Sequence, residues 1–146
     1  MSRSVEILKK RYLKNIKENP DLFIGIELEY PIVNLEGKAT DGEVVKDLFG
    51  YLPSVLGFTI EKVDDFGNPI QLLDPVSQDT ILFEVAYTTI EFAFGKAESI
   101  QEVEERFNFY MATIQNKLGE ANHAIVGCGI HPNWDKNENC PVAYPR

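Results

Sequence analysis

A strict alternation of apolar and polar residues between positions 23 and 30 restricts the fold of this chain more than any other feature. The apolar side chains fall on every second position: Ile24, Ile26, Leu28 and Tyr30. The positions between them hold Gly25, Glu27 and Glu29. Because successive side chains of a strand point to opposite faces of a sheet, the pattern predicts a strand with one apolar and one acidic face.

The other patterns predict helices and further strands in one domain. Apolar residues at helical spacing predict helices over residues 4–19, 41–52 and 99–119, the last of them opened by a Ser99 capping box. Residues 58–63, 80–94 and 124–130 have the composition of strands, and residues 64–75 are rich in turn residues. We therefore expect residues 1–146 to form a single α+β domain, with an antiparallel or mixed sheet and helices packed on one face.

Composition narrows the classes of partner. The chain has 146 residues, 23 acidic and 14 basic, for a formal net charge of -9. Nucleic acid attracts basic surfaces through its phosphates, so a nucleic-acid partner is not expected. No run approaches the roughly 20 apolar residues that span a bilayer, and the first residues lack the apolar core of a secretory signal. We expect a cytoplasmic protein with no membrane partner, whose two cysteines are reduced thiols.

Glu27 and Glu29 are candidate metal ligands. On one strand face their Cβ atoms lie roughly 7 Å apart, given a rise of about 3.3 Å per residue. Two such carboxylates raise each other's pKa unless a cation lies between them, and a hard ion such as Mg²⁺ or Mn²⁺ suits oxygen ligands. The alternative is a solvated strand face, on which paired glutamates are common.

Glu84 and Glu91 are further acids inside the most β-rich segment. They are seven residues apart, so a single regular strand would place them on opposite faces. Both can serve one site only if a bulge or turn intervenes, and residues 87–89 are the expected place. Among weaker candidates, His131 follows a predicted strand, and Cys128 lies among apolar residues as expected of an inert core thiol.

These segments resemble the glutamate–cysteine ligase (gamma-glutamylcysteine synthetase) family. Residues 23–30 resemble the Gly-x-Glu-x-Glu strand that opens the active site of that family, and residues 80–92 its next acidic region. Residues 127–134 are similar to the Gly-x-Gly-x-x-Pro-x-Trp stretch of the plant and proteobacterial branch, and residues 141–146 to the Pro-rich lead into its Arg-Tyr motif.

The resemblance implies a glutamine synthetase-like catalytic fold and a set of metal ligands. The ligands would be Glu27, Glu29, Glu84 and Glu91, holding Mg²⁺ beside ATP. The implied reaction belongs to glutathione biosynthesis: ATP phosphorylates the γ-carboxylate of glutamate, and the amine of cysteine then attacks the acyl phosphate. The family position that matches Glu84 is often Asp.

The family is much longer than this chain. The resemblance therefore implies the N-terminal part of a catalytic domain, inactive alone and completed by a missing part, a second chain or a homodimer. Two alternatives remain open. One is a ligase that uses a different amine; the other is a non-catalytic domain that binds a partner through its sheet, with Phe92 and Phe94 available for dimerisation.

Overall fold

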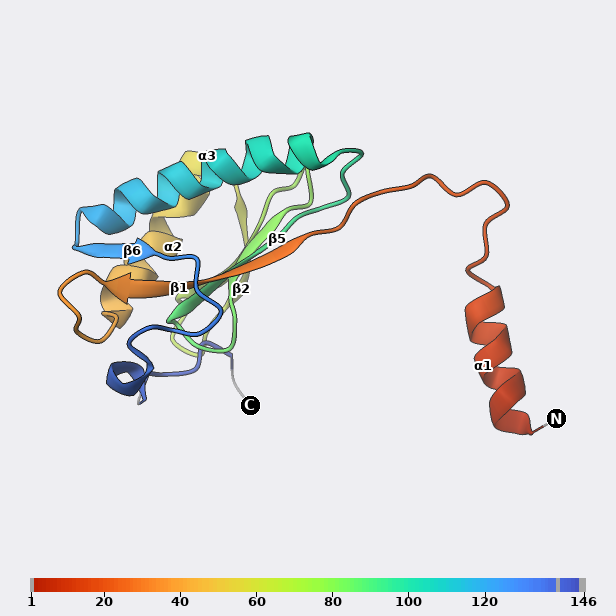
Figure 1. Cartoon of the computed structure of the whole chain (residues 1–146), viewed down its shortest axis with the longest axis horizontal. Helices are drawn as coiled ribbons and strands as arrows, with labels where there is room; N and C mark the ends of the chain where they lie inside the picture. Colours follow the sequence, from red (N-terminus) through yellow and green to blue (C-terminus); the bar gives the residue numbers. More distant parts are fainter. Residues whose placement is uncertain (1, 139, 145–146) are drawn as a thin grey trace.

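The computed structural model describes residues 2–138 and 140–144, and its main body is an antiparallel sheet covered on one face by two helices (Figure 1). The helices are α1 (Arg3–Leu13), α2 (Gly42–Leu56) and α3 (Ile100–Gly119), with a short 3-10 helix, η1, at Trp134–Asn137. The strands are β1 (Glu27–Asn34), β2 (Thr59–Val63), β3 (Pro69–Leu73), β4 (Thr80–Phe83), β5 (Thr89–Ala93) and β6 (His123–Ile125). The predicted α+β class is confirmed.

The sheet runs in the order β2-β3-β4-β5-β1-β6, and every pairing between neighbours is antiparallel. β2 to β5 follow one another along the chain, so each pairs with the next through a short connection. β1 then joins β5 from the other side, and β6 pairs with the far end of β1. β1, the strand that contains Glu27 and Glu29, is thus an inner strand of the sheet.

One face of the sheet is sealed by α2 and α3. Side chains from both helices and from the strands form a single apolar core, in which the largest fully buried members include Ile32, Leu48, Phe49, Phe83, Phe92 and Ile114. Phe49 of α2 stacks on Phe83 of β4, with ring centroids 3.8 Å apart. The helices therefore pack on one face, as predicted, and the opposite face carries the polar side chains of β1 and β5.

Local signals explain where α2 and α3 begin and end. The side chains of Asp41 and Ser99 accept hydrogen bonds from the N–H groups of Glu43 and Glu102, which caps the two N-termini. Gly57 ends α2 with a φ of 75°, in the left-handed region that glycine enters freely. The predicted start of α3 is confirmed, whereas α2 extends four residues beyond its predicted end.

Several other predicted elements differ from the structure. The strand predicted over residues 23–30 begins later, as Glu27–Asn34, and the predicted segment 80–94 is divided into β4 and β5. The first helix ends at Leu13 rather than near residue 19, because its apolar stripe meets no partner that would stabilise further turns. β3 lies inside the segment predicted as turns. The strand predicted over residues 124–130 is limited to His123–Ile125, since Gly127 and Gly129 offer no side chains to pack.

α1 lies apart from the sheet and its helices (Figure 1). None of its residues is buried, and residues 14–23 that connect it to the body are exposed as well. The Nζ atom of Lys96 lies 5.4 Å from the centre of the Phe23 ring, and the backbone of the segment first pairs with the body at Ile24, which forms an isolated antiparallel bridge with Ala97. Among the residues described, no helix is both long and apolar enough to cross a membrane.

Candidate functional site

The open face of the sheet brings the four predicted acids together, and we call Glu27, Glu29, Glu84 and Glu91 the acid face. In the register of β1 and β5, Glu29 lies directly opposite Glu91, and Glu27 lies opposite Ala93. Glu91 is therefore a direct cross-strand neighbour of Glu29 and a diagonal neighbour of Glu27. Glu27 and Glu29 are exposed while their neighbours Ile26, Leu28 and Tyr30 are half-buried, which confirms the predicted faces.

Glu84 joins this group because a hairpin turn separates it from Glu91. β4 ends at Phe83 and β5 begins at Thr89, and the register pairs Leu82 with Glu91. The N–H of Glu84 donates to the carbonyl oxygen of Thr89 (2.9 Å), so Glu84 is the next residue along on the same face as Leu82. In this hairpin the directly paired residues are an odd number of positions apart, so Glu84 and Glu91, seven positions apart, lie on the same face, whereas one continuous strand would place them on opposite faces. The predicted turn is present, and it begins directly after Phe83.

Glu91 is the electrostatic centre of the acid face. Its pKa is raised to about 7, first by burial, then by a hydrogen bond with Glu84 and by the charges of Glu84, Glu27 and Glu29. Like charges directly opposite each other on a sheet are destabilising. Near neutral pH this arrangement favours either a proton on Glu91 or a cation beside it.

The segment of residues 140–144, which we call the strap, returns to the turn between β4 and β5 and brings Tyr144 toward the acid face. Burial raises the pKa of Tyr144 to about 12, and the charges of Glu91 and Glu84 contribute. Its hydroxyl oxygen is buried and has no hydrogen-bond partner among the described residues, and the same holds for the side-chain oxygen of Gln71. The Nζ atom of Lys62 lies 5.8 Å from the centre of the Tyr144 ring. No local pattern in the sequence indicates these neighbours.

The chemistry of the acid face fits a hard divalent cation, since carboxylate oxygens are the ligands that Mg²⁺ and Mn²⁺ prefer. Its geometry limits the number of protein ligands that one ion could have. In the part of the chain that the structure describes, no three His, Cys, Asp or Glu side chains converge so as to hold a metal ion. Mg²⁺ is commonly bound by one or two carboxylates, with waters and substrate phosphates completing its shell. The cross-strand pair of Glu29 and Glu91 could supply the two carboxylates that such a Mg²⁺ site needs.

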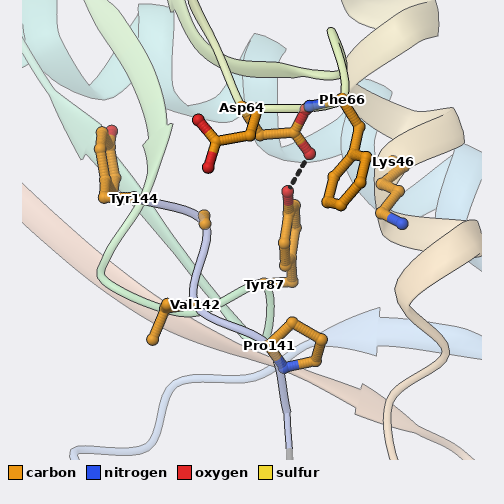
Figure 2. A pocket seen from close by; sticks show the side chains of 9 residues that line it. Lys46, Asp64, Phe66, Tyr87, Pro141, Val142 and Tyr144 are labelled. Carbon is orange, nitrogen blue, oxygen red and sulfur yellow. Dashed lines mark hydrogen bonds between the residues drawn. The ribbon is translucent and has the colours of Figure 1, made fainter. Parts of the chain in front are cut away.

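The strap also lines a pocket of about 210 Å³ (Figure 2). It is lined by the turn after β2, by Tyr87, by Lys46 of α2 and by residues 141–144. The Tyr87 hydroxyl donates to Asp64 (2.6 Å). Burial alone would raise the pKa of Asp64, but hydrogen bonds from Asn68, Tyr87 and Phe66 outweigh it and hold the pKa well below the usual range. Asp64 is thus fully engaged in holding this turn against Tyr87.

The weaker candidates have structural roles. The Nε2 atom of His131 lies 2.9 Å from the carbonyl oxygen of Ile32, and its Nδ1 atom accepts from the N–H of Asn133. The buried ring of His123 accepts from the N–H of Asp41 at the start of α2. The prediction that Cys128 is a core thiol is wrong: Cys128 is exposed, because the strand expected around it does not form.

A buried ion pair lies away from the acid face and was not predicted. Asp79, before β4, is 1% exposed and accepts from Arg106 (2.6 Å) and Tyr110 (2.9 Å) of α3. It also accepts from the N–H of Gly95 (2.7 Å), where any side chain would collide with the backbone of Ser77. This network links the turn before β4 to α3. The Nη1 atom of Arg106 donates to Asp79, whereas its buried Nη2 atom has no hydrogen-bond partner among the described residues and lies 3.5 Å from Glu102.

Comparison with known proteins adds no family assignment. No protein-family model matches the sequence, and no curated protein is significantly similar to it.

Proposed function

We propose that the acid face is the metal-binding wall of an ATP-dependent carboxylate–amine ligase site, of which this chain supplies the first part. The observation that carries the proposal is the cross-strand register, which surrounds Glu91 with the other three glutamates that the resemblance to glutamate–cysteine ligases singles out. Repulsion between such close carboxylates is relieved by a divalent cation. The proposed glutamine synthetase-like fold agrees with an antiparallel sheet that leaves one acidic face open.

The proposed reaction phosphorylates the γ-carboxylate of glutamate and then joins it to the amine of cysteine. A divalent ion, when bound, neutralises phosphate charge and aligns the reacting groups. Glu29 and Glu91 would hold it directly, while Glu27 and Glu84 would complete its surroundings through water or through a second ion. None of the carboxylates needs to transfer a proton in this scheme.

The basic side chains that would bind the phosphates of ATP would come largely from outside the acid face. Of the 14 basic residues, six lie between positions 3 and 17, in and just after the helix that lies apart from the sheet. Lys62 is the basic residue that the structure places against Tyr144. We therefore propose that a further part of the protein or a second chain completes the phosphate site.

The alternative of a dimerising domain gains no support from the residues that suggested it. Phe92 is 1% exposed and Phe94 is 8% exposed, since both pack in the core beneath α3. Neither is available to a partner.

Calorimetric titration of Mg²⁺ and Mn²⁺ into the purified chain, with and without ATP, tests the proposal. We expect divalent binding by the wild type and at least a ~10-fold loss of affinity in Glu27→Gln/Glu29→Gln, because that variant removes two carboxylates from the acid face. Glu104→Gln/Glu105→Gln is the matched control: it removes the same charge from exposed positions of α3 and should bind as the wild type does.

The outcomes separate the parts of the proposal. A wild type that binds neither ion would overturn the metal site. Equal loss in both double variants would show that net charge, and not the acid face, attracts the ions. Glutamate-dependent release of phosphate from ATP by this chain would show that no second part is required.

A further inference from the structure

The turn between β4 and β5 holds a residue in an unusual backbone conformation beside the acid face. Val85 has a φ of 61°, in the left-handed region that β-branched residues rarely enter. The N–H of Ala86 donates to the carbonyl oxygen of Glu84 (2.7 Å), which closes a three-residue γ-turn around Val85. A γ-turn of positive φ is rare and strained, so surrounding structure must hold it in place.

The strap is the structure that holds it. The N–H of Ala143 donates to the carbonyl oxygen of Val85 (2.8 Å), and the N–H of Tyr87 donates to Pro141 (3.5 Å). Between these bonds, Ala86 and Val142 form an antiparallel bridge. Ala143 is 2% exposed whereas Val85 is 47% exposed. Backbone pairing with the strap, and not burial of the valine side chain, therefore maintains the turn.

The turn around Val85 in turn fixes the backbone of Glu84. The N–H of Glu84 is bonded to Thr89 and its carbonyl oxygen to Ala86, so both of its backbone polar groups are engaged in the hairpin. A valine in this conformation restricts the neighbouring dihedral angles far more than a glycine would, since glycine populates many conformations there without strain. The direction in which the Glu84 side chain leaves the backbone is correspondingly restricted.

We propose that Val85 is a positioning residue, whose left-handed turn, held by the strap, directs Glu84 toward Glu91 and couples divalent-cation binding on the acid face to the pairing of the strap. The proposal rests on the proposed function, because it needs the acid face to bind an ion. It adds that residues 140–144 are part of the site, although none of them is among the four carboxylates.

The test compares Val85→Gly with two other variants by titration of Mg²⁺ into the full chain. Val85→Gly should weaken binding by about 10-fold while the chain stays folded, because a loosened support typically lowers metal affinity by that order. Val85→Asn should bind nearly as the wild type does, since asparagine tolerates the left-handed region but keeps a Cβ atom. Gln78→Gly is the matched control: Gln78 has a φ of 64° at the opposite end of β4, and its variant should bind normally.

Hydrogen exchange supplies a second readout that does not depend on a substitution. Mg²⁺ should slow exchange of the Ala143 amide, because this N–H is the bond that joins the strap to the Val85 turn. Thermal unfolding of each variant confirms that it is folded.

The results discriminate between this inference and the proposed function. Wild-type affinity in Val85→Gly, or an equal loss in Gln78→Gly, would overturn the positioning role even if Glu27→Gln/Glu29→Gln abolishes binding. Unchanged exchange at Ala143 would overturn the coupling to the strap. Absence of Mg²⁺ binding by the wild type would overturn the proposed function and this inference with it.

Discussion

Glu91 is the residue of the acid face that is repelled by all three of the other carboxylates. Its neighbours come from one strand and a turn: Glu29 of β1 lies directly opposite, and Glu27 of β1 and Glu84 of the turn lie on the diagonals. Burial and these neighbours raise its pKa to about 7, against an ordinary value of 4.5. A site that is poised in this way exchanges a proton for a metal ion close to neutral pH, so ion binding there should strengthen as the pH rises from 5 to 8.

The same shift predicts a pH dependence of stability. Between about pH 4.5 and pH 7 the folded chain keeps a proton on Glu91 that the unfolded chain has lost, so the free energy of unfolding falls as the pH rises through this window. Glu91→Gln should remove that fall and stabilise the fold at pH 8 by on the order of 1 kcal/mol, since partial exposure screens the repulsion.

Urea denaturation at pH 5 and pH 8, without divalent ions, measures the effect. Glu104→Gln, at an exposed position of α3, should leave the difference between the two pH values as it is in the wild type. A wild-type pH dependence retained in Glu91→Gln would contradict the prediction.

At the scale of the elements, the turn before β4 is joined to α3 by the buried pair of Asp79 and Arg106. The Arg106 side chain is 18% exposed, and its guanidinium lies 5.8 Å from the centre of the Phe94 ring. Removing one partner of a buried ion pair leaves an uncompensated charge, which is more damaging than losing an exposed pair. The fold should therefore depend strongly on this one contact.

Arg106→Met tests that dependence. Methionine keeps much of the packing against Phe94 but leaves Asp79 without its cation, so we expect a loss of about 3–5 kcal/mol in the free energy of unfolding. Lys117→Met removes the cation from the pair of Lys117 and Glu120, which is more exposed than the pair of Asp79 and Arg106, and should change stability by less than ~1 kcal/mol. Urea denaturation measures the free energy of unfolding of both variants. Equal losses would show that the buried pair contributes no more to stability than the exposed one.

At the scale of the whole molecule, the chain consists of a packed body and an N-terminal helix without buried residues. The core cluster draws its members from residue 32 onward, with Ile26, Leu28 and Tyr30 packed against it. None of residues 2–23 is buried, so this described segment contributes no member to the core.

Deletion of residues 2–20 should leave the body intact. We expect the thermal midpoint to change by about 2 °C or less, because a stability change below ~0.5 kcal/mol shifts the midpoint of a domain of this size only slightly. Calorimetric unfolding of the two proteins provides the measurement. A drop of ten degrees or more would mean that α1 packs on the body in solution.

The sequence predicted the parts of the fold that local patterns encode. The alternation around Glu27 and Glu29 gave the correct faces of β1, and the Ser99 capping signal gave the start of α3. The predicted turn between Glu84 and Glu91 is also present. These features depend on residues close together along the chain, where propensity and periodicity act directly.

The remaining features depend on contacts between distant segments. β3 was hidden by its flanking turn residues, and its buried Ile70 and Leu72 are recognisable only once β4 pairs beside them. The approach of the strap to Val85 and the pairing of Asp79 with Arg106 likewise join positions 58 and 27 residues apart. No local pattern encodes such pairings, so the central position of Glu91 became evident only with the strand register.

The separation of α1 from the sheet also makes the N-terminal segment a handle for experiments. A fluorophore, a biotin or a surface linker attached near Ser2 would lie beyond an exposed helix and an exposed connecting segment. It would leave the acid face facing the solution. The chain could therefore be anchored on a sensor chip by this end, with the exposed helix and connecting segment as a spacer between the chip and the body.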